Sequence, residues 1–230
     1  MRDTPPPAMR LESIQVGLPQ TLGGGDSSDR PQREWRSALF KSPVESAVSA
    51  SKTGLAGDGQ ADLENHGGVD MAINAYPREH FDYWTEKLQI QFPAGAFGEN
   101  FSTLGMTEQS TCIGDTYQVG DIIVQVSQPR KPCWKIARRW QVKDLAAQVE
   151  RTGLTGWYFR VLEEGEVEAP AAISLVDRPH PEWSIAEVNE IVCRRKDDAG
   201  QASQLGSCPA LSEGWRQLLM RRAESLSGDG

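Results

Sequence analysis

The sequence of 230 residues predicts a mostly β protein with helices, of the α+β class, in which a β-barrel or β-sandwich precedes a small helical region. Over the first 180 residues, short segments of apolar and β-branched residues alternate with turn signals, a pattern that favours barrels and sandwiches over doubly wound sheets. After Pro181, apolar residues recur at helical spacing. The sequence contains none of the glycine-rich motifs of dinucleotide enzymes or phosphate-binding loops, and no signature of α/β-hydrolases or zincins.

The first expected strand, residues 11–18, alternates apolar and polar side chains and ends at Pro19. Residues 21–31 are rich in Gly, Ser and Asp and predict a mobile surface loop. Gly120-Asp121 is the turn signal of a later hairpin. The remaining expected strands are residues 35–40, 44–48, 71–76, 116–119, 122–126, 157–162 and 167–176, with irregular chain at 52–62 and 92–100.

Two helices are expected before Pro181. Residues 78–88 follow Pro77, which the first turn of a helix tolerates, and residues 143–151 form a short helix closed by Gly153. In the C-terminal region, Ser184 and Glu187 have the spacing of a capping box that starts another helix. A connection at residues 205–211 leads to a last helix, which Ser212 is placed to cap.

These elements predict a disordered N-terminus at residues 1–8, a barrel domain at 9–180 and a three-helix-type appendage at 181–230. The appendage is below the size that usually folds without extra support. We therefore expect it to dock on the barrel or on a partner.

The composition is typical of a globular cytoplasmic protein. Hydrophobic residues make up 38% of the chain, and no apolar run approaches the length of about 20 residues that a membrane span needs. Pro5-Pro6-Pro7 stands where a secretory signal would have its apolar segment. A net charge of −8 argues against general binding to nucleic acids. The cysteines are widely spaced, which favours reduced thiols; they are Cys112, Cys133, Cys193 and Cys208.

The most informative segment is Gln128-Pro129-Arg130-Lys131-Pro132-Cys133-Trp134. Six basic residues and no acidic one lie between positions 130 and 143. Neighbouring cations favour the thiolate of Cys133, which is the form that attacks electrophiles and ligates metals. The two prolines suit a rigid loop that presents a side chain. Cysteine is often only a small buried hydrophobe, but this setting favours a ligand or nucleophile for an anionic, sulfur-seeking partner. The other three cysteines lack this basic, proline-flanked setting and are expected to be structural.

Three further segments are candidate ligand contacts, each with a plainer structural interpretation. His66-Gly67-Gly68 pairs a proton donor with glycines that permit close approach of the backbone, or it is a tight turn. Glu99 and Asn100 are suited to hydrogen-bond the edge of a heterocycle, or Asn100 satisfies a turn. Arg78 opens a helix whose N-terminal amides attract anions. The spacing of histidines around Cys133 does not support a zinc site.

Taken in order, these motifs resemble the MOSC domain, named for the C-terminal domain of molybdenum cofactor sulfurase. They are most similar to the YiiM-like branch, in which the barrel is followed by a small helical domain. The resemblance covers residues 9–224, and the ordered series is more specific than any single motif. It is carried by Gly57-Asp58, His66-Gly67-Gly68-Val69-Asp70, Tyr76-Pro77-Arg78-Glu79-His80, Phe97-Gly98-Glu99-Asn100-Phe101-Ser102, Ile113-Gly114-Asp115 and Gln125-Val126-Ser127-Gln128-Pro129-Arg130-Lys131-Pro132-Cys133.

The resemblance implies a MOSC-type β-barrel that binds molybdenum cofactor, a pterin whose dithiolene holds the metal. Cys133 matches the family's cysteine, which is proposed to ligate molybdenum or to carry sulfur as a persulfide. YiiM-like members are associated with detoxification of N-hydroxylated bases such as 6-hydroxylaminopurine, and the family also with pyridoxal phosphate. The implied cofactor contacts are Arg130, Lys131, Asn100, Glu99, His66, Gly67, Gly68, Arg78 and Gln128.

Three functions therefore stay open. A reductase of N-hydroxylated substrates would need a separate redox partner protein, because the sequence has no flavin, haem or iron–sulfur signature. A sulfur carrier would receive sulfur at Cys133 from a cysteine desulfurase. In an interaction protein, the helical tail would bind a partner. The chain also departs from the family, which usually has Pro and then Asp-Arg where Val69-Asp70-Met71 stands here, a small residue at Lys131 and no insertion at residues 23–31.

Overall fold

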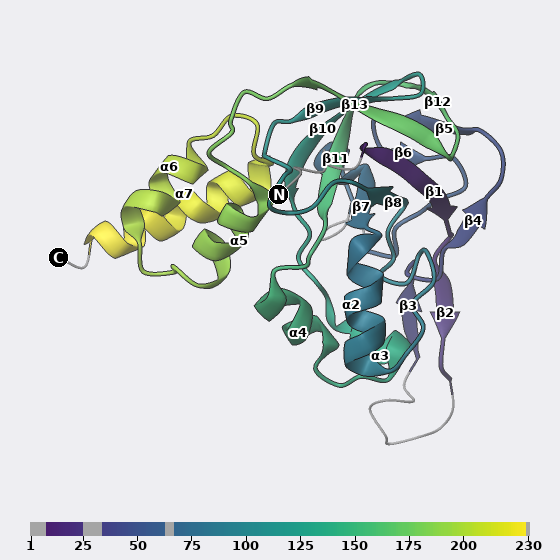
Figure 1. Ribbon diagram of the computed structural model, residues 1–230. Helices are drawn as coiled ribbons and strands as arrows, with labels where there is room; N and C mark the ends of the chain where they lie inside the picture. Colours follow the sequence, from purple (N-terminus) through teal and green to yellow (C-terminus); the bar gives the residue numbers. More distant parts are fainter. Residues whose placement is uncertain (1–7, 25–33, 63–66, 229–230) are drawn as a thin grey trace, which may run out of the picture.

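The computed structural model describes residues 8–24, 34–62 and 67–228, and its centre is a closed barrel of seven strands (Figure 1). The barrel strands are β1 (Arg10–Val16), β7 (Ile73–Pro77), β8 (Phe101–Leu104), β9 (Thr116–Val119), β10 (Ile122–Pro129), β11 (Trp157–Glu163) and β13 (Ala171–Asp177). Their order is β13-β9-β10-β11-β7-β8-β1, and pairing of β13 with β1 closes the ring. Of the strand pairs in this ring, β7 and β8 run parallel and the others run antiparallel. The predicted β-barrel is confirmed.

Alternating side chains fill the barrel. Val124 and Val126 of β10 are fully buried, and so are Tyr117 of β9 and Phe159 of β11. The rings of Tyr117 and Phe159 meet edge to face, with their centroids 6.1 Å apart. Burying an apolar side chain of this size contributes about 1.5–3 kcal/mol. A shift of one residue would turn this set outward, so burial also holds the strand register.

Smaller strands surround the barrel, and several expected boundaries were wrong. They are β2 (Gln20–Leu22), β3 (Trp35–Ser37), β4 (Ser42–Val44), β5 (Val48–Ser51), β6 (Gly54–Leu55) and β12 (Gly165–Val167). The loop expected from Thr21 begins later because β2 pairs with β3, and most of that loop lies outside the described residues. Val44 and Val48 belong to different strands, since β4 pairs with β1 whereas β5 pairs with β6 and β12.

Three helices pack together at one end of the barrel (Figure 1): α2 (Glu79–Leu88), α3 (Trp134–Trp140) and α4 (Leu145–Thr152). Their second core is centred on Phe97, whose ring stacks on Tyr76 at 4.5 Å and on Phe92 at 5.4 Å. Pro77 ends β7 and does not enter α2. The sequence did not predict α3, because Ile136 is its one fully buried side chain and leaves no apolar period to detect.

Three more helices form the C-terminal region: α5 (Ile185–Cys193), α6 (Ala199–Gly206) and α7 (Glu213–Gly228). The hydroxyl of Ser184 accepts a hydrogen bond from the Glu187 amide, as the capping box predicted. The expected connection at residues 205–211 instead begins inside α6, which Asp198 caps. Buried residues of all three helices belong to the same apolar cluster as the barrel core (Figure 1). The helical region is therefore docked on the barrel.

The four cysteines, all within the described ranges, form no disulfide with one another. No helix within the described ranges has the length and apolar character needed to cross a membrane.

Asp70 joins the barrel to the C-terminal helices. Its Oδ1 accepts a hydrogen bond from Nε of Arg160 at 2.9 Å, and its Oδ2 accepts one from the backbone N–H of Glu213 at 3.2 Å. The hydroxyl of Ser127 donates to the Asp70 carbonyl, and the Ser127 carbonyl accepts from the amide of Ser212. One carboxylate therefore contacts both β11 and the start of α7.

We expect Asp70→Ala to lower the free energy of unfolding by about 1.5–3 kcal/mol, since hydrogen bonds to charged groups contribute this much. Asp82→Ala, which removes an exposed carboxylate from α2, is the matched control and should change stability little. Urea denaturation measures both variants. Equal stability of the two variants would show that the Asp70 junction contributes nothing.

Candidate functional site

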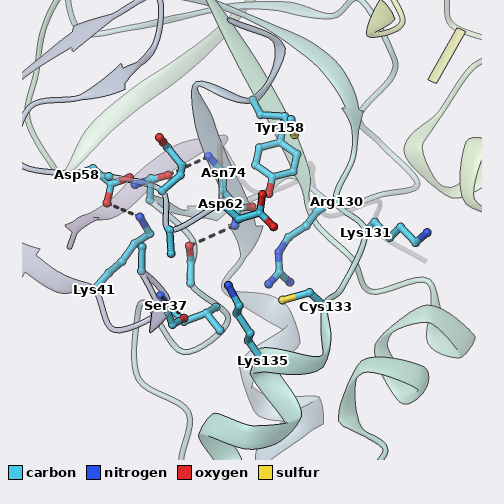
Figure 2. Close-up of a pocket in the computed structure, with 18 residues that line it drawn as sticks. Ser37, Lys41, Asp58, Asp62, Asn74, Arg130, Lys131, Cys133, Lys135 and Tyr158 are labelled. Carbon is cyan, nitrogen blue, oxygen red and sulfur yellow. Dashed lines mark hydrogen bonds and ion pairs between the residues drawn. The ribbon is translucent and has the colours of Figure 1, made fainter. Parts of the chain in front are cut away.

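A cavity opens between the barrel and the segment that carries Cys133 (Figure 2). It encloses about 620 Å³, including its open mouth. Its walls come from segments far apart in the sequence: residues 37–41, residues 58–62, Met71 and Asn74, Gly98 and Asn100, residues 130–135, and Tyr158. The cavity is therefore assembled by the closed barrel and the loops at its rim.

Cys133 lies at the edge of this cavity. Strand β10 ends at Pro129, and the chain then turns through Pro132 into α3, with Cys133 directly before the helix. The side chain is half-buried. In Figure 2 its sulfur points toward the guanidinium of Arg130 and the side chain of Lys135. The thiol thus faces two cations inside a protein of net charge −8.

Arg130 is buried, with 5% of its surface exposed. Its Nη2 donates to the carbonyl of Phe97 at 2.6 Å. Its Nη1 is buried and has no hydrogen-bond partner in the described part of the chain. Leaving a buried charged donor unpaired is costly, so this nitrogen is suited to an acceptor from a ligand. Burial also raises the pKa of Tyr158 in the same wall, while Arg130 opposes that shift.

Asn74 supplies a hydrogen-bond acceptor to the same cavity, which complements the donor of Arg130. Its Nδ2 donates to the carbonyl of Gly98 at 3.3 Å, and its backbone N–H donates to Oδ1 of Asn100 at 3.1 Å. Its own Oδ1 is buried and accepts no hydrogen bond from the described residues. Among the described residues, the cavity therefore holds one unused buried donor, on Arg130, and one unused buried acceptor, on Asn74.

Lys41 and Asp58 form a buried ion pair in the opposite wall (Figure 2). Asp58 also accepts from the backbone N–H of Gly17 at 2.8 Å. Burial lowers the pKa of Lys41, and the nearby carboxylate of Asp58 offsets part of that effect. This pair keeps the loop at residue 58 against the barrel.

The lowered pKa of Lys41 makes stability depend on pH in the alkaline range. Between that pKa and the ordinary pKa of lysine, the unfolded chain holds a proton that the folded chain has released. The contribution of Lys41 to the free energy of unfolding should therefore rise with pH across this window. The cysteines and tyrosines whose pKa values burial raises contribute a fall over the same alkaline range. Urea denaturation at several alkaline pH values should therefore show a steeper loss of stability with pH in Lys41→Met than in the wild type, and an unchanged pH slope in Lys87→Met. An identical pH slope in all three proteins would contradict this assignment.

The structure brings together some of the predicted contacts. Cys133, Arg130 and Asn100 line the cavity, although both polar atoms of the Asn100 side chain already bond to the backbone, at Asn74 and Gln15. Lys131 borders the cavity, but its side chain is exposed and points away from the thiol in Figure 2.

Other predicted contacts lie outside the cavity lining. The buried carboxylate of Glu99 accepts from the backbone N–H groups of Gly95 and Phe97, and so holds a turn. Gln128 is buried opposite Tyr158 in the sheet. Arg78 is exposed, with its guanidinium 5.0 Å from the centre of the Phe81 ring.

The histidine–glycine segment is described only in part, because His66 lies outside the described residues. Gly68 has φ of 94°, and nothing lies within 4 Å of the position a Cβ would occupy. Neither Gly67 nor Gly68 lines the cavity. Position 98, in contrast, requires glycine. Its φ is 78°, and a Cβ there would lie 2.3 Å from a methyl carbon of Leu39. Within the described residues, no group of three or more His, Cys, Asp or Glu side chains is placed to hold a metal ion.

Sequence reasoning missed Asn74, Lys41, Asp58 and Tyr158 as cavity residues. Asn74 and Tyr158 lie within strands that the pattern identified only as barrel elements. A polar residue inside an apolar strand, as in Ile73-Asn74-Ala75, is a signal that would have marked Asn74.

Comparison with known proteins agrees with this architecture. Residues 62–174 match the MOSC domain family, and residues 183–226 match the YiiM-like 3-alpha helix domain. YflK of Bacillus subtilis is 40% identical, over 93% of this chain and 94% of its own length. The chain belongs to the MOSC family, in its YiiM-like branch.

Two further relatives of this MOSC chain are informative. The crystal structure of YiiM from Geobacillus stearothermophilus superposes with a TM-score of 0.79 at 41% identity, covering 94% of this chain and 99% of that one. A protein of Gibberella moniliformis named "Reductase" is 33% identical over 84% of this chain, which spans only 33% of that larger protein. The MOSC barrel and its three helices thus recur together in separate proteins.

Proposed function

We propose that this MOSC protein binds molybdenum cofactor in the cavity, with Cys133 as a ligand of the metal, and reduces N-hydroxylated compounds. The observation that carries the proposal is the thiol of Cys133 facing the cavity beside a buried arginine with an unused donor. The MOSC match supplies the class of cofactor.

The cavity residues fit such a cofactor. A thiolate is a soft ligand, suited to a sulfur-bound metal. Nη1 of Arg130, which has no partner among the described residues, suits an anionic or carbonyl oxygen, and Oδ1 of Asn74, likewise without a described partner, suits an N–H group of a heterocycle. Lys135 adds a second cation beside the thiol (Figure 2). A pterin with a phosphate tail offers all of these partners.

The bound cofactor would supply the two-electron redox chemistry. The reaction takes R–NHOH, two electrons and two protons to R–NH₂ and water, with cleavage of the N–O bond. The chain's own residues would hold the metal and neutralise negative charge near it. Tyr158 lines the same cavity, and its phenol is protonated at neutral pH, as for an ordinary tyrosine, with burial raising its pKa further.

The relative named "Reductase" supports reduction as the class of reaction. Since this chain spans about a third of that protein, the activity of the whole relative comes to this chain only as part of the proposal. No described feature favours a persulfide at Cys133 over a metal, so the sulfur-carrier function is the outcome that the experiment must separate.

Metal analysis of protein purified from cells that make the cofactor tests the proposal. Molybdenum near one atom per chain, together with conversion of 6-hydroxylaminopurine to adenine by a chemical reductant, is the expected result. Molybdenum-free protein with a persulfide on Cys133, detected by mass spectrometry, would replace the reductase with a sulfur carrier.

A further inference from the structure

A basic and aromatic surface borders the cavity next to Cys133. We call it the α3 face and define it by Lys131, Trp134, Lys135 and Arg138. Trp134 is 55% exposed, which is unusual for so large an apolar side chain. The guanidinium of Arg138 lies 5.8 Å from the centre of the Trp134 ring and 5.0 Å from that of Trp35. The two tryptophan rings are 5.7 Å apart.

The charge of the α3 face differs from that of the chain as a whole. The protein carries a net charge of −8, yet no acidic residue lies between positions 130 and 143. Among the residues that the structure describes, Lys131 forms no ion pair. Its side chain points away from the cavity in Figure 2, whereas that of Lys135 points into it. Lys131 therefore remains available to an anionic surface.

The proposed reduction consumes two electrons per turnover. The 230 residues contain no flavin, haem or iron–sulfur signature, so the electrons must come from a donor outside them. Electron transfer weakens steeply with distance, and the donor must approach the metal ligand closely. The α3 face is adjacent to Cys133, because Trp134 follows it directly in the sequence.

We propose, resting on the reductase function above, that the α3 face is the docking surface for an acidic electron-donor protein. An exposed tryptophan surrounded by cations has the character of an interface hot spot, since Trp and Arg are enriched at such sites. Complementary charge speeds encounter and fixes orientation. Repulsion by the rest of the acidic chain disfavours other orientations of an acidic donor. The same net charge makes a nucleic acid the less suitable occupant.

The test compares a protein donor with a small one. Reduced flavodoxin, an acidic one-electron carrier, and reduced methyl viologen each drive reduction of 6-hydroxylaminopurine by the cofactor-loaded enzyme. The variants are Arg138→Glu and Trp134→Ala, because neither of these residues lines the cavity. Arg221→Glu is the control, because it reverses one charge on the exposed side of α7, in the C-terminal region away from α3 (Figure 1).

We expect Arg138→Glu and Trp134→Ala to raise the KM for flavodoxin about 5- to 30-fold, the range of interface hot spots. Viologen-driven turnover should stay within about twofold of wild type, and Arg221→Glu should change neither rate. Added salt should slow the flavodoxin reaction alone. Equal effects of Arg138→Glu and Arg221→Glu on the flavodoxin reaction would overturn the proposal.

Fluorescence anisotropy of flavodoxin binding keeps the test independent of turnover. If wild type fails to turn over with viologen, the reductase function fails, yet weaker binding by Arg138→Glu than by Arg221→Glu would still support the docking surface. No binding of flavodoxin, or tighter binding of a single-stranded oligonucleotide that depends on Arg138, would reject it.

Discussion

Cys133→Ala is expected to abolish reduction of N-hydroxylated substrates while the protein stays folded. Loss of a partner that only supports a metal ligand costs about 10- to 100-fold, so removal of the ligand itself should cost at least about 100-fold. Because the side chain is half-buried at the cavity edge, the free energy of unfolding should change by less than about 1 kcal/mol. Turnover, molybdenum content and urea denaturation measure the three quantities.

Cys193→Ala is the matched control for this variant. Cys193, like Cys133, is half-buried and in no disulfide, but it lies on α5 and outside the cavity lining. It should keep both molybdenum and activity. Unfolding of Cys133→Ala, or full activity in that variant, would mean that Cys133 is a packing residue.

Arg130→Met should weaken retention of the cofactor about 10- to 100-fold, since a hydrogen bond to a charged group contributes about 1.5–3 kcal/mol. Methionine fills the space of the arginine stem but offers no donor to the ligand. It also leaves the carbonyl of Phe97 without its bond from Nη2, so a smaller loss of stability should accompany the loss of affinity. Molybdenum content after extended dialysis reports the affinity, and urea denaturation reports the stability.

Arg130→Lys separates charge from shape. Lysine keeps the positive charge but cannot reach both the Phe97 carbonyl and a ligand with a planar fork, so it should restore only part of the retention. Arg151→Met, an exposed arginine on α4, is the control. If Arg130→Met retained molybdenum as well as Arg151→Met does, the unused donor would have no role in binding the cofactor.

The fold was largely predictable because its main signals are local. The hairpin around Gly120, the N-cap at Ser184 and the closing Gly153 each depend on a few neighbouring residues, and each is present in the structure. Helix α3 was missed because one buried residue gives no periodicity. For α6 a usable signal existed, since Asp198 stands three residues before Gln201, whose amide it caps.

The candidate site was predictable only where charge and backbone chemistry mark it. Cys133 and Arg130 are recognisable from their own segment, and both line the cavity. Glu99 and Asn74 show the limit. Glu99 has the more reactive side chain, but the fold uses its carboxylate to hold a turn. Asn74 is inconspicuous in sequence, yet the closure of the barrel leaves its oxygen unpaired in the cavity.

The apolar cluster shared by the barrel and the C-terminal helices has a consequence for how the chain can be divided. Ile185, Leu205 and Leu219 are buried in the same cluster as barrel residues such as Ile113 and Val126. The change of sequence pattern near residue 180 is therefore a boundary in composition but not in folding energy. Removing the helices would expose the flank of the barrel to water, so the two regions should melt in a single cooperative transition. A barrel truncated at this point would be a damaged protein rather than a minimal one.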